Sequence, residues 1–481
     1  MSTAPPPAPT GPAPATTGAH VWPVSGRTGE ALSALAQRLA DHVRARPGLR
    51  AEEVAHSLVT GRAHGEHRAA VVGTGRDDLL AGLDALAARR PSDAVVSGLA
   101  RPDGGVVLVF TGAGGQWRGM GGGLWDDSPV FRDSVRACAE AFEPYVDWSL
   151  VDVVRGRRGA ASMNRVDVVQ PALFTMAVSL AAVWRAFGVR PAAVVGHSQG
   201  EIAAAHVAGA LSLQDAARVV ALRSRLIAGA LAGKGAMLSV PLPATEVRQR
   251  LASWGDRIAV AAVNGPRTTS VAGEPAAIEE FFAELVDEGV RVARIVSDFA
   301  SHSAQVDAIH SALIDALGPL RCEASDVLFC STVTGGVLDT AELDAEYWYE
   351  NLRRPVLFDS AVRTLLRRGF GMFVEPSPHP LLVAPIEEIA AEVGARATAI
   401  GTLRMGESDA ARLLASVAEA HVHGTAVDLR QACRGGSRVG LPLDDVAEGS
   451  DAENRFWSAV RRGDLATALG VVLPALDTGA G

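Results

Sequence analysis

The sequence is poor in cysteine and in lysine, and both deficits narrow the possible classes of protein. Its four cysteines, Cys138, Cys322, Cys330 and Cys433, are far apart, and no C-x-x-C pair or zinc-ligand spacing occurs. We therefore expect a reduced, cytosolic protein without a disulfide framework or a metal site. Lys234 is the only lysine among 45 basic residues, a bias that is typical of a GC-rich genome and carries no functional signal.

Signals for targeting and for membrane insertion are also missing. Residues 1–20 are rich in Pro, Ala and Thr and lack the basic start and apolar core of a signal peptide, so they predict a disordered leader. No uncharged apolar run reaches about 18 residues. We take the best apolar stretch to begin at Val219, and Arg223 and Arg225 interrupt it. The formal net charge of -9 is unlike that of a nucleic-acid binder. We expect neither a membrane nor a nucleic acid as partner.

The length of 481 residues predicts roughly three structural units at about 150 residues each. Residues 21–100 alternate short apolar runs with amphipathic segments and predict a small α/β unit. Its expected helices and strands lie at 29–44, 68–72, 77–89 and 94–97. Residues 401–481 become helical and then loose, which predicts a C-terminal tail.

The middle of the chain, residues 101–400, predicts a parallel α/β fold. The V-V-L-V-F run at 106–110 is a buried type of strand that leads into a glycine-rich loop, and residues 191–211 show a second strand-to-helix unit. Within this region, residues 235–297 show the order strand–helix–strand–strand–helix–strand, which is typical of a ferredoxin-like unit. We therefore expect an α/β protein that carries an inserted ferredoxin-like subdomain.

A candidate nucleophile, Ser198, lies in G-H-S-Q-G at 196–200, which matches G-x-S-x-G between a valine-rich strand and an alanine-rich helix. The two glycines permit the sharp turn that exposes a serine hydroxyl, and the following helix N-terminus favours developing negative charge. The alternative interpretation is a tight turn with a capping serine. A serine nucleophile needs a base, and spacing alone does not choose among the twelve histidines.

Seven separated motifs make the sequence resemble the acyltransferase domains of modular type I polyketide synthases, relatives of the malonyl-CoA:acyl-carrier-protein transacylases. The motifs follow that family's order from residue 106 to about residue 400: VFTGAGGQWRGMG, RVDVVQPALF, GHSQGEIAAAHVAGALSL, ALRSR, AVNGPRTTSVAG, DFASHSAQVD and VEPSPHPLL. The resemblance implies an α/β-hydrolase-like core with a ferredoxin-like insertion, in agreement with the periodicity. Residues 21–100 resemble the linker domain that normally follows a ketosynthase.

The resemblance also implies roles for particular residues. Ser198 is the expected nucleophile, and His302 in the F-A-S-H segment is the expected general base. The family orients this histidine through a backbone carbonyl, expected near the position of His379, so no acidic third residue is required. Two backbone N–H groups, those of Gln199 and Ala113, are expected to form the oxyanion hole.

Other matching positions concern the substrate pocket. Gln170 and Asn264 match pocket-lining positions of the family. Phe299 and Ser301 belong to a tetrapeptide that usually reads Y-A-S-H in methylmalonyl-selective members and H-A-F-H in malonyl-selective ones. Serine leaves more room than phenylalanine, so we expect an α-substituted acyl group. The loop at 110–114 reads F-T-G-A-G where the family has F-P-G-Q-G, which preserves a backbone donor but changes one edge of the pocket.

Arg223 matches the position where extender-type members keep an arginine for the free carboxylate of a dicarboxylic acyl group. A guanidinium group binds a carboxylate at two points, a geometry that lysine cannot reproduce. The alternative is an arginine on a helix surface, which is the interpretation we favour for Arg225. Members that load monocarboxylic starters often replace this arginine with a bulky apolar residue, so its presence predicts a dicarboxylic substrate.

The implied reaction moves the acyl group from an acyl-CoA thioester to Ser198 and then to the phosphopantetheine thiol of an acyl carrier protein. We expect no tightly bound cofactor, and the carrier protein is absent from this chain. No ketosynthase segment precedes the linker, which predicts a loading module that selects a starter unit. The alicyclic diacid of a borrelidin-type synthase fits that hypothesis, and a methylmalonyl-selective extender domain is the alternative. The expected location is the cytoplasm of an actinomycete-like bacterium.

Two other classes of function are open at this point. An α/β-hydrolase-type thioesterase also uses G-x-S-x-G and needs the order Ser…Asp/Glu…His, for which Ser198, Asp307 and His379 are available. The ferredoxin-like unit and the N-G-P and F-A-S-H segments argue against it. A catalytically silent scaffold domain is the second alternative, and the presence of both Ser198 and His302 argues against that one.

Overall fold

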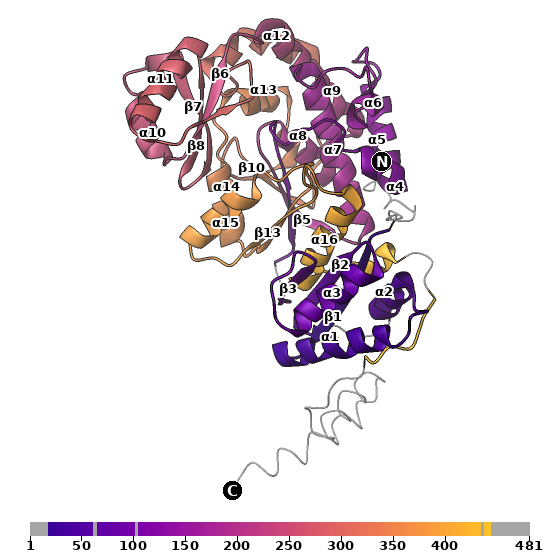
Figure 1. Cartoon of the computed structure of the whole chain (residues 1–481). Helices are drawn as coiled ribbons and strands as arrows, with labels where there is room; N and C mark the ends of the chain where they lie inside the picture. The colour runs from indigo at the N-terminus through magenta and orange to yellow at the C-terminus, as the bar shows by residue number, and fades with distance from the viewer. Residues whose placement is uncertain (1–17, 61–64, 102–103, 434–436, 444–481) are drawn as a thin grey trace, which may run out of the picture.

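The computed structural model describes residues 18–60, 65–101, 104–433 and 437–443. Residues 1–17 of the predicted leader and the greater part of the predicted tail therefore lie outside the described residues, whereas His20, which we placed in the leader, is the first residue of a strand. Within the described residues the chain forms three β-sheets, one for each of three parts of the molecule. Figure 1 shows the N-terminal part at the bottom, the central sheet above it and the third sheet at the upper left.

The N-terminal sheet is antiparallel and has the order β1-β2-β3. Its elements are β1 (His20–Gly26), α1 (Gly29–Arg44), α2 (Ala51–Thr60), β2 (His67–Gly73), α3 (Arg76–Ala87) and β3 (Val95–Leu99). Helix α1 begins and ends at the predicted residues, because Thr28 caps its first turn and its apolar stripe is buried. Strand β1 and helix α2 were not predicted. Pro23 is tolerated in β1 because β1 lies at the edge of the sheet.

The central sheet has the order β11-β10-β5-β4-β12-β13, and every pairing except that of β11 is parallel. Its strands are β4 (Val106–Phe110), β5 (Pro191–Gly196), β10 (Leu328–Ser331), β11 (Gly336–Leu338), β12 (Met372–Glu375) and β13 (Thr398–Gly401). In β4, alternate side chains enter two different hydrophobic clusters, one on each face. The buried run V-V-L-V-F thus reflects a strand that is covered on both sides.

Helices cover both faces of the central sheet. The larger cluster contains α4 (Gly122–Asp127), α5 (Pro129–Phe142), α6 (Leu150–Val154), α7 (Val166–Ala186), α8 (Gly200–Ala208), α9 (Leu213–Ala230), α12 (His310–Leu317), α13 (Ala345–Arg353) and α16 (Asp409–Val422). The opposite cluster contains α14 (Phe358–Arg367) and α15 (Val383–Glu392). The mixed α/β fold with a parallel core agrees with the fold class predicted from the sequence.

Helix α7 contains the longest apolar stretch of the described chain, which the hydropathy pattern had placed elsewhere. It is long and apolar enough to cross a membrane by length and composition, and 83% of its most apolar window is buried inside the protein. The longest uncharged apolar run is therefore 168–184 within α7, and not the stretch that begins at Val219. Packing in the core accounts for this apolar character.

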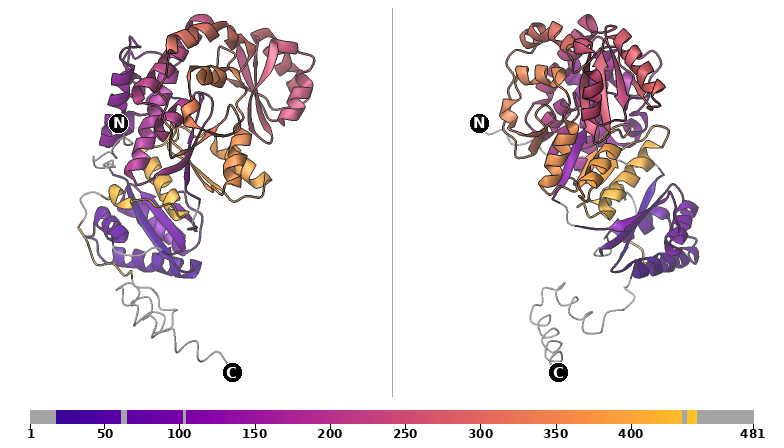
Figure 2. Two further views of the ribbon diagram at one scale, coloured as in Figure 1. Left: turned by 180° about the vertical axis from the view of Figure 1, so that it is seen from behind. Right: turned by 90° about the vertical axis from the view of Figure 1, so that its left-hand side faces the viewer.

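The third sheet is antiparallel and has the order β7-β8-β6-β9. Its elements are β6 (Ala236–Val240), α10 (Ala244–Leu251), β7 (Ile258–Gly265), β8 (Thr268–Gly273), α11 (Pro275–Asp287) and β9 (Ala293–Ile295). The order of elements is that of a ferredoxin-like unit, and the unit has its own hydrophobic cluster. Backbone hydrogen bonds of Val356 with Ala261 and Val263 attach β7 to the central part. The left view of Figure 2 shows this sheet at the upper right of the central one.

Helix α16 connects the central part with the N-terminal part. It contacts β2 and β3 of the N-terminal sheet as well as α4 and β13. Val21 and Ala70 of that sheet form a small cluster with Ala418 and Val422 of the helix. The region after residue 400 therefore begins with a helix that packs against both neighbouring parts.

Candidate active site

The turn that carries Ser198 requires glycine on both sides. Ser198 has a φ of 55°, in the left-handed region that a serine rarely adopts. A Cβ atom added to Gly200 would lie 2.2 Å from the carbonyl oxygen of Phe110, and one added to Gly196 would lie 2.2 Å from the Glu201 nitrogen. Strand β5, helix α8 and the end of β4 can therefore meet this closely only where no side chain is present. The strained turn projects the serine hydroxyl into a cleft.

His302 is the hydrogen-bond partner of that hydroxyl. Its Nε2 atom lies 2.8 Å from Oγ of Ser198, and its side chain is almost fully buried. His302 also has a positive φ, 59°, and its backbone N–H donates to the carbonyl of Leu352 at 2.9 Å. The structure thus brings together the two residues predicted to act as nucleophile and base. In this geometry the imidazole can accept the serine proton.

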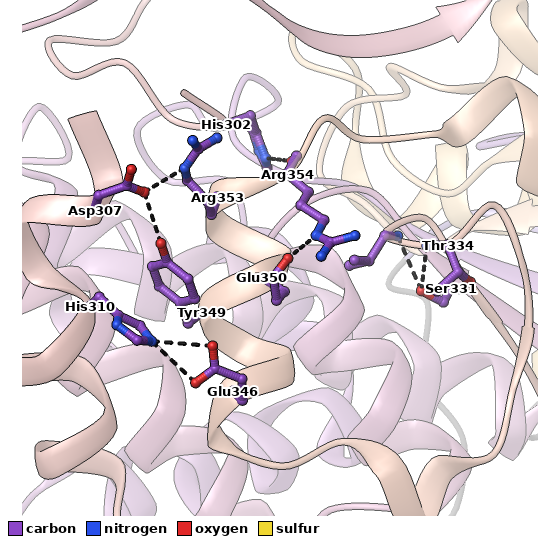
Figure 3. Close-up of polar contacts among 11 residues, drawn as sticks. His302, Asp307, His310, Ser331, Thr334, Glu346, Tyr349, Glu350, Arg353 and Arg354 are labelled. Carbon is purple, nitrogen blue, oxygen red and sulfur yellow. Dashed lines mark hydrogen bonds and ion pairs between the residues drawn. The ribbon is translucent and has the colours of Figure 1, made fainter. Parts of the chain in front are cut away.

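The carbonyl that orients His302 belongs to Arg354, which corrects the prediction that placed it near His379. Nδ1 of His302 lies 2.7 Å from this oxygen. Figure 3 marks this contact between His302 and Arg354. A carbonyl only accepts, so Nδ1 carries the proton and Nε2 is free to accept from Ser198. Pro355 follows Arg354 and favours its extended conformation, with φ -81° and ψ 155°, at the end of α13.

Asp307 and His379 take no part in the pair. The Asp307 carboxylate accepts hydrogen bonds from Oη of Tyr349, at 2.8 Å, and from Nε of Arg353, so it ties the segment after His302 to α13 (Figure 3). Nδ1 of His379 instead accepts from the backbone N–H of Met405 at 3.3 Å. The Ser…Asp…His order of a hydrolase triad is therefore not realised by these residues.

Burial lowers the pKa of His302 to about 3. The Arg354 carbonyl opposes this shift, while the nearby His197 and Arg223 reinforce it because they disfavour a second positive charge. The imidazole is consequently neutral at physiological pH. A neutral imidazole is the form that can take a proton from the serine.

The backbone N–H of Gln199 directly follows Ser198 in the chain, and that of Ala113 lies in a loop that packs against the Ser198 turn. Gln199 precedes the first residue of α8, and the Gly112–Gly114 loop packs against the turn, so that a Cβ on Gly112 would be 3.1 Å from the His197 carbonyl. Among the described residues, neither N–H has a hydrogen-bond partner. The replacement of the usual glutamine by Ala113 leaves this backbone geometry available for an oxyanion.

Arg223 extends from α9 into the same cleft and is completely buried. Its Nη1 donates to Oδ1 of Asn351 at 2.7 Å, whereas its Nε and Nη2 have no partner among the described residues. Burial lowers the pKa of the guanidinium to about 10, and the nearby Glu201 carboxylate opposes the shift. The group therefore stays cationic at neutral pH. A buried cation with two unused donors is an anion-binding arrangement.

The cleft has a volume of about 1410 Å³ and contains most of the predicted pocket residues. The predicted residues that line it are Ala113, Gln170, Ser198, Gln199, Arg223, Asn264, Phe299, Ser301 and His302. Ser301 donates to Sδ of Met237 at 3.4 Å, so a flexible thioether faces the small serine. Oδ1 of Asn264 lies 2.7 Å from Nε2 of His197. His379 is not among the lining residues.

Asn351, Arg354 and Met237 contact predicted site residues and were not themselves predicted. Asn351 and Arg354 lie in N-L-R-R-P at the end of a helix, where proline marks the helix end but nothing in the sequence indicates what the exposed carbonyl contacts. Met237 lies in β6 of the inserted subdomain and reaches the cleft only through the packing of the two parts.

The chain belongs to the acyltransferase family, because residues 107–427 match the acyl transferase domain. More narrowly, it is an acyltransferase domain of the modular polyketide synthase type. Residues 20–83 match the family described as CurL-like, PKS C-terminal. The family match extends to residue 427 and includes α16, whereas we expect the acyltransferase part to end at residue 400.

Curated relatives and solved structures support this assignment. Erythronolide synthase EryA2 of Saccharopolyspora erythraea is 48% identical over 93% of this chain, and the mycoketide-CoA synthase of Mycobacterium tuberculosis is 48% identical over 94%. The chain covers only 12% and 11% of these two proteins. The acyltransferase domain from module 8 of the salinomycin polyketide synthase is 50% identical, with a TM-score of 0.84 over 87% of this chain and 99% of that one.

A loading acyltransferase from the avermectin modular polyketide synthase is 49% identical, with a TM-score of 0.64 over 66% of this chain and 100% of that one. A domain from a numbered module and a loading domain thus have almost the same identity to this chain.

Proposed function

We propose that this domain transfers an α-substituted dicarboxylic acyl group from a CoA thioester to Ser198, and then to the phosphopantetheine thiol of an acyl carrier protein during polyketide synthesis in the bacterial cytoplasm. The observation that carries the proposal is the buried Arg223, whose Nε and Nη2 are unpartnered in the cleft that also holds Ser198 and His302. A free carboxylate on the acyl group is the ligand that this cation fits.

Elsewhere in the chain, the same edge of arginine binds carboxylates. Nε and Nη2 of Arg165 donate to the two oxygens of Asp167 at 3.1 and 2.6 Å, and those of Arg294 donate to Glu279 at the same two distances. In Arg223 this edge is buried and has no protein partner among the described residues. A substrate carboxylate would complete there the bidentate contact that the other two arginines make with the protein.

The acylation half-reaction starts at Oγ of Ser198. His302 Nε2 takes the hydroxyl proton as the oxygen attacks the thioester carbonyl, and the N–H groups of Ala113 and Gln199 receive the resulting oxyanion. Collapse of the tetrahedral adduct breaks the C–S bond. The imidazolium returns its proton to the departing CoA sulfur, which leaves an acyl ester on Ser198.

Transfer to the carrier repeats these steps with the thiol as nucleophile. His302 takes the proton of the phosphopantetheine thiol, the thiolate attacks the ester, and Oγ of Ser198 leaves and regains a proton from the imidazolium. The free enzyme is restored and no redox step or metal ion is required. The cycle is a double displacement in which one site serves both thiols.

The expected size of the acyl group depends on Phe299, Ser301 and Met237. Ser301 is small and its partner Met237 is flexible, so this wall can accept a substituent on the α-carbon. Methylmalonyl is the smallest such diacid, and bulkier diacids remain part of the proposal. A panel of diacid thioesters of increasing α-substituent size ranks them directly.

The prediction of a loading module depended on the position of the linker near residue 1. The chain spans only about a tenth of the length of its curated relatives, so the position of the linker in this chain does not indicate the type of module. Both starter selection and methylmalonyl extension use the chemistry described above.

The proposed function is tested by incubating the purified domain with methylmalonyl-CoA and isobutyryl-CoA, in which a methyl group replaces the carboxylate. Faster acylation by methylmalonyl-CoA and onward transfer to a carrier thiol support the proposal. Acylation followed only by release of the free acid, with no carrier product, contradicts it and favours a thioesterase.

A further inference from the structure

Asn351 lies between the residue that would bind the substrate carboxylate and the residue that attacks the substrate. Its Oδ1 accepts from Nη1 of Arg223 at 2.7 Å, and its Nδ2 donates to the backbone carbonyl of Ser198 at 3.1 Å. Nδ2 also donates to Oε2 of Glu201 at 2.7 Å. The orientation of the amide is determined by these partners, because arginine only donates and both other partners accept.

Glu201 makes the far side of this arrangement rigid. Its carboxylate is completely buried and receives four hydrogen bonds: from Nδ2 of Asn351, from Oη of Tyr347 at 2.7 Å, and from both the backbone N–H and the Oγ1 of Thr332. Burial raises the pKa of Glu201, and the four donors oppose that shift. Asn351 thus separates a buried carboxylate from the buried guanidinium of Arg223 and forms a hydrogen bond with each.

The helix that carries Asn351 is itself held in place. Asp307, on the segment that follows His302, binds Tyr349 and Arg353 on the same helix α13, as Figure 3 shows. The main chain of His302 donates to Leu352, the residue after Asn351. Small displacements of α13 would therefore move the base and Asn351 together.

We propose that Asn351 is a positioning residue for substrate selection: it holds the guanidinium of Arg223 through Nη1, so that the Nε and Nη2 edge faces the cleft at a set distance from Ser198. This inference rests on the proposed function. Asn351 occupies the one donor that is not part of the bidentate edge, and its second bond is to the backbone of the nucleophile itself. The side chain of Asn351 thereby connects Arg223, which would bind the substrate carboxylate, to Ser198, the proposed nucleophile.

Removal of Asn351 has a specific expected consequence. The guanidinium loses its only hydrogen-bond partner among the described residues, and Glu201 becomes the nearest competing anion. Pairing with Glu201 would turn Arg223 away from the substrate. Discrimination in favour of diacids then falls, whereas acylation by a substrate without a carboxylate is affected less.

The test compares kcat/KM for methylmalonyl-CoA and isobutyryl-CoA in four proteins: wild type, Asn351→Ala, Arg223→Ala and the double variant. Asn351→Ala is expected to lower the ratio of the two values by about tenfold or more, the scale of one charge-assisted hydrogen bond. In the Arg223→Ala background the same substitution is expected to leave the ratio unchanged, because the two residues act as one unit.

Two control variants separate positioning from stability. Tyr347→Phe removes another donor to Glu201 without touching Arg223, and it is expected to leave the ratio at the wild-type value. If Asn351→Ala does not fold, Asn351→Ser keeps a polar group near Glu201 but is too short to serve both Arg223 and Ser198. Thermal unfolding of each variant reports whether it is folded.

The possible outcomes are distinct. An unchanged ratio in folded Asn351→Ala or Asn351→Ser, or losses that add in the double variant, overturns the role of Asn351. A wild-type domain that shows no preference for methylmalonyl-CoA over isobutyryl-CoA overturns the proposed dicarboxylic specificity, and the positioning role with it. A wild-type preference for methylmalonyl-CoA that is lost in Asn351→Ala and in Arg223→Ala supports both the dicarboxylic specificity and the positioning role of Asn351.

Discussion

Nδ1 of His302 lies 2.7 Å from the carbonyl oxygen of Arg354, and this contact determines which imidazole nitrogen faces the serine. Because the carbonyl can only accept, the proton resides on Nδ1, and Nε2 presents a lone pair to Ser198 at 2.8 Å. A backbone group thus takes the orienting part that an aspartate has in a triad. The imidazole of His302 is thus oriented by a main-chain carbonyl and not by a carboxylate.

The first prediction concerns the pH dependence of acylation. The pKa of His302 is lowered to about 3, and the neutral form is the active one, so the rate should not fall as pH decreases through 6.5, the usual value of a histidine. Burst rates of Ser198 acylation between pH 5 and 8, at constant ionic strength, measure this. A rate that halves near pH 6.5 would show that His302 titrates as an ordinary imidazole.

The second prediction concerns the base itself. His302→Ala removes the proton acceptor of Ser198 and is expected to slow acylation by a factor on the order of 10² or more. Rapid-quench acylation with the preferred CoA thioester gives the rate, and circular dichroism checks the fold. A rate close to that of wild type would assign the general base to another residue.

The third prediction compares two replacements of Arg223. Arg223→Ala should lower kcat/KM for methylmalonyl-CoA far more than for isobutyryl-CoA, because only the former carries a carboxylate. Arg223→Lys keeps the charge but not the two-point geometry, so it should recover only part of the discrimination. Equal losses with both thioesters in Arg223→Ala would indicate a structural role for the buried guanidinium.

The fourth prediction tests the turn around Ser198. Gly200→Ala puts a Cβ within 2.2 Å of the Phe110 carbonyl, and the backbone must shift, so we expect a loss of about 1–3 kcal/mol in the free energy of unfolding together with impaired acylation. Gly229→Ala is the matched control, because Gly229 lies in α9 with no atom within 4 Å of the added Cβ. Gly229→Ala should leave the free energy of unfolding unchanged or raise it by up to about 1 kcal/mol. A fully active, stable Gly200→Ala protein would contradict the close-approach argument.

Local patterns in the sequence predicted most of the fold. Helix 29–44 was predicted with its observed ends because capping and periodicity agree there, and the ferredoxin-like order at 235–297 follows from alternating short elements. Strand β1 was missed because Pro23 and Gly26 resemble a turn, and only the edge position in the sheet makes the proline acceptable. Helix α2 is only ten residues long, and its periodic signal is correspondingly weak.

Ser198 and His302 could be predicted from motifs, whereas the groups that hydrogen-bond to them and orient them could not. Ser198 and His302 are each marked by their neighbours in the sequence. The Arg354 carbonyl and the Asn351 amide act through contacts between segments about 50 or more residues apart, and a main-chain acceptor leaves no mark in the identity of its own side chain. The misplaced expectation at His379 arose for that reason.

The most direct test of the account is the intact mass of the domain after incubation with methylmalonyl-CoA, for wild type and for Ser198→Ala. We predict that wild type gains the mass of one methylmalonyl group, that a carrier protein thiol removes it, and that Ser198→Ala gains nothing. An acyl adduct on Ser198→Ala, or wild type that is never acylated by any dicarboxylic thioester, would contradict the central claim.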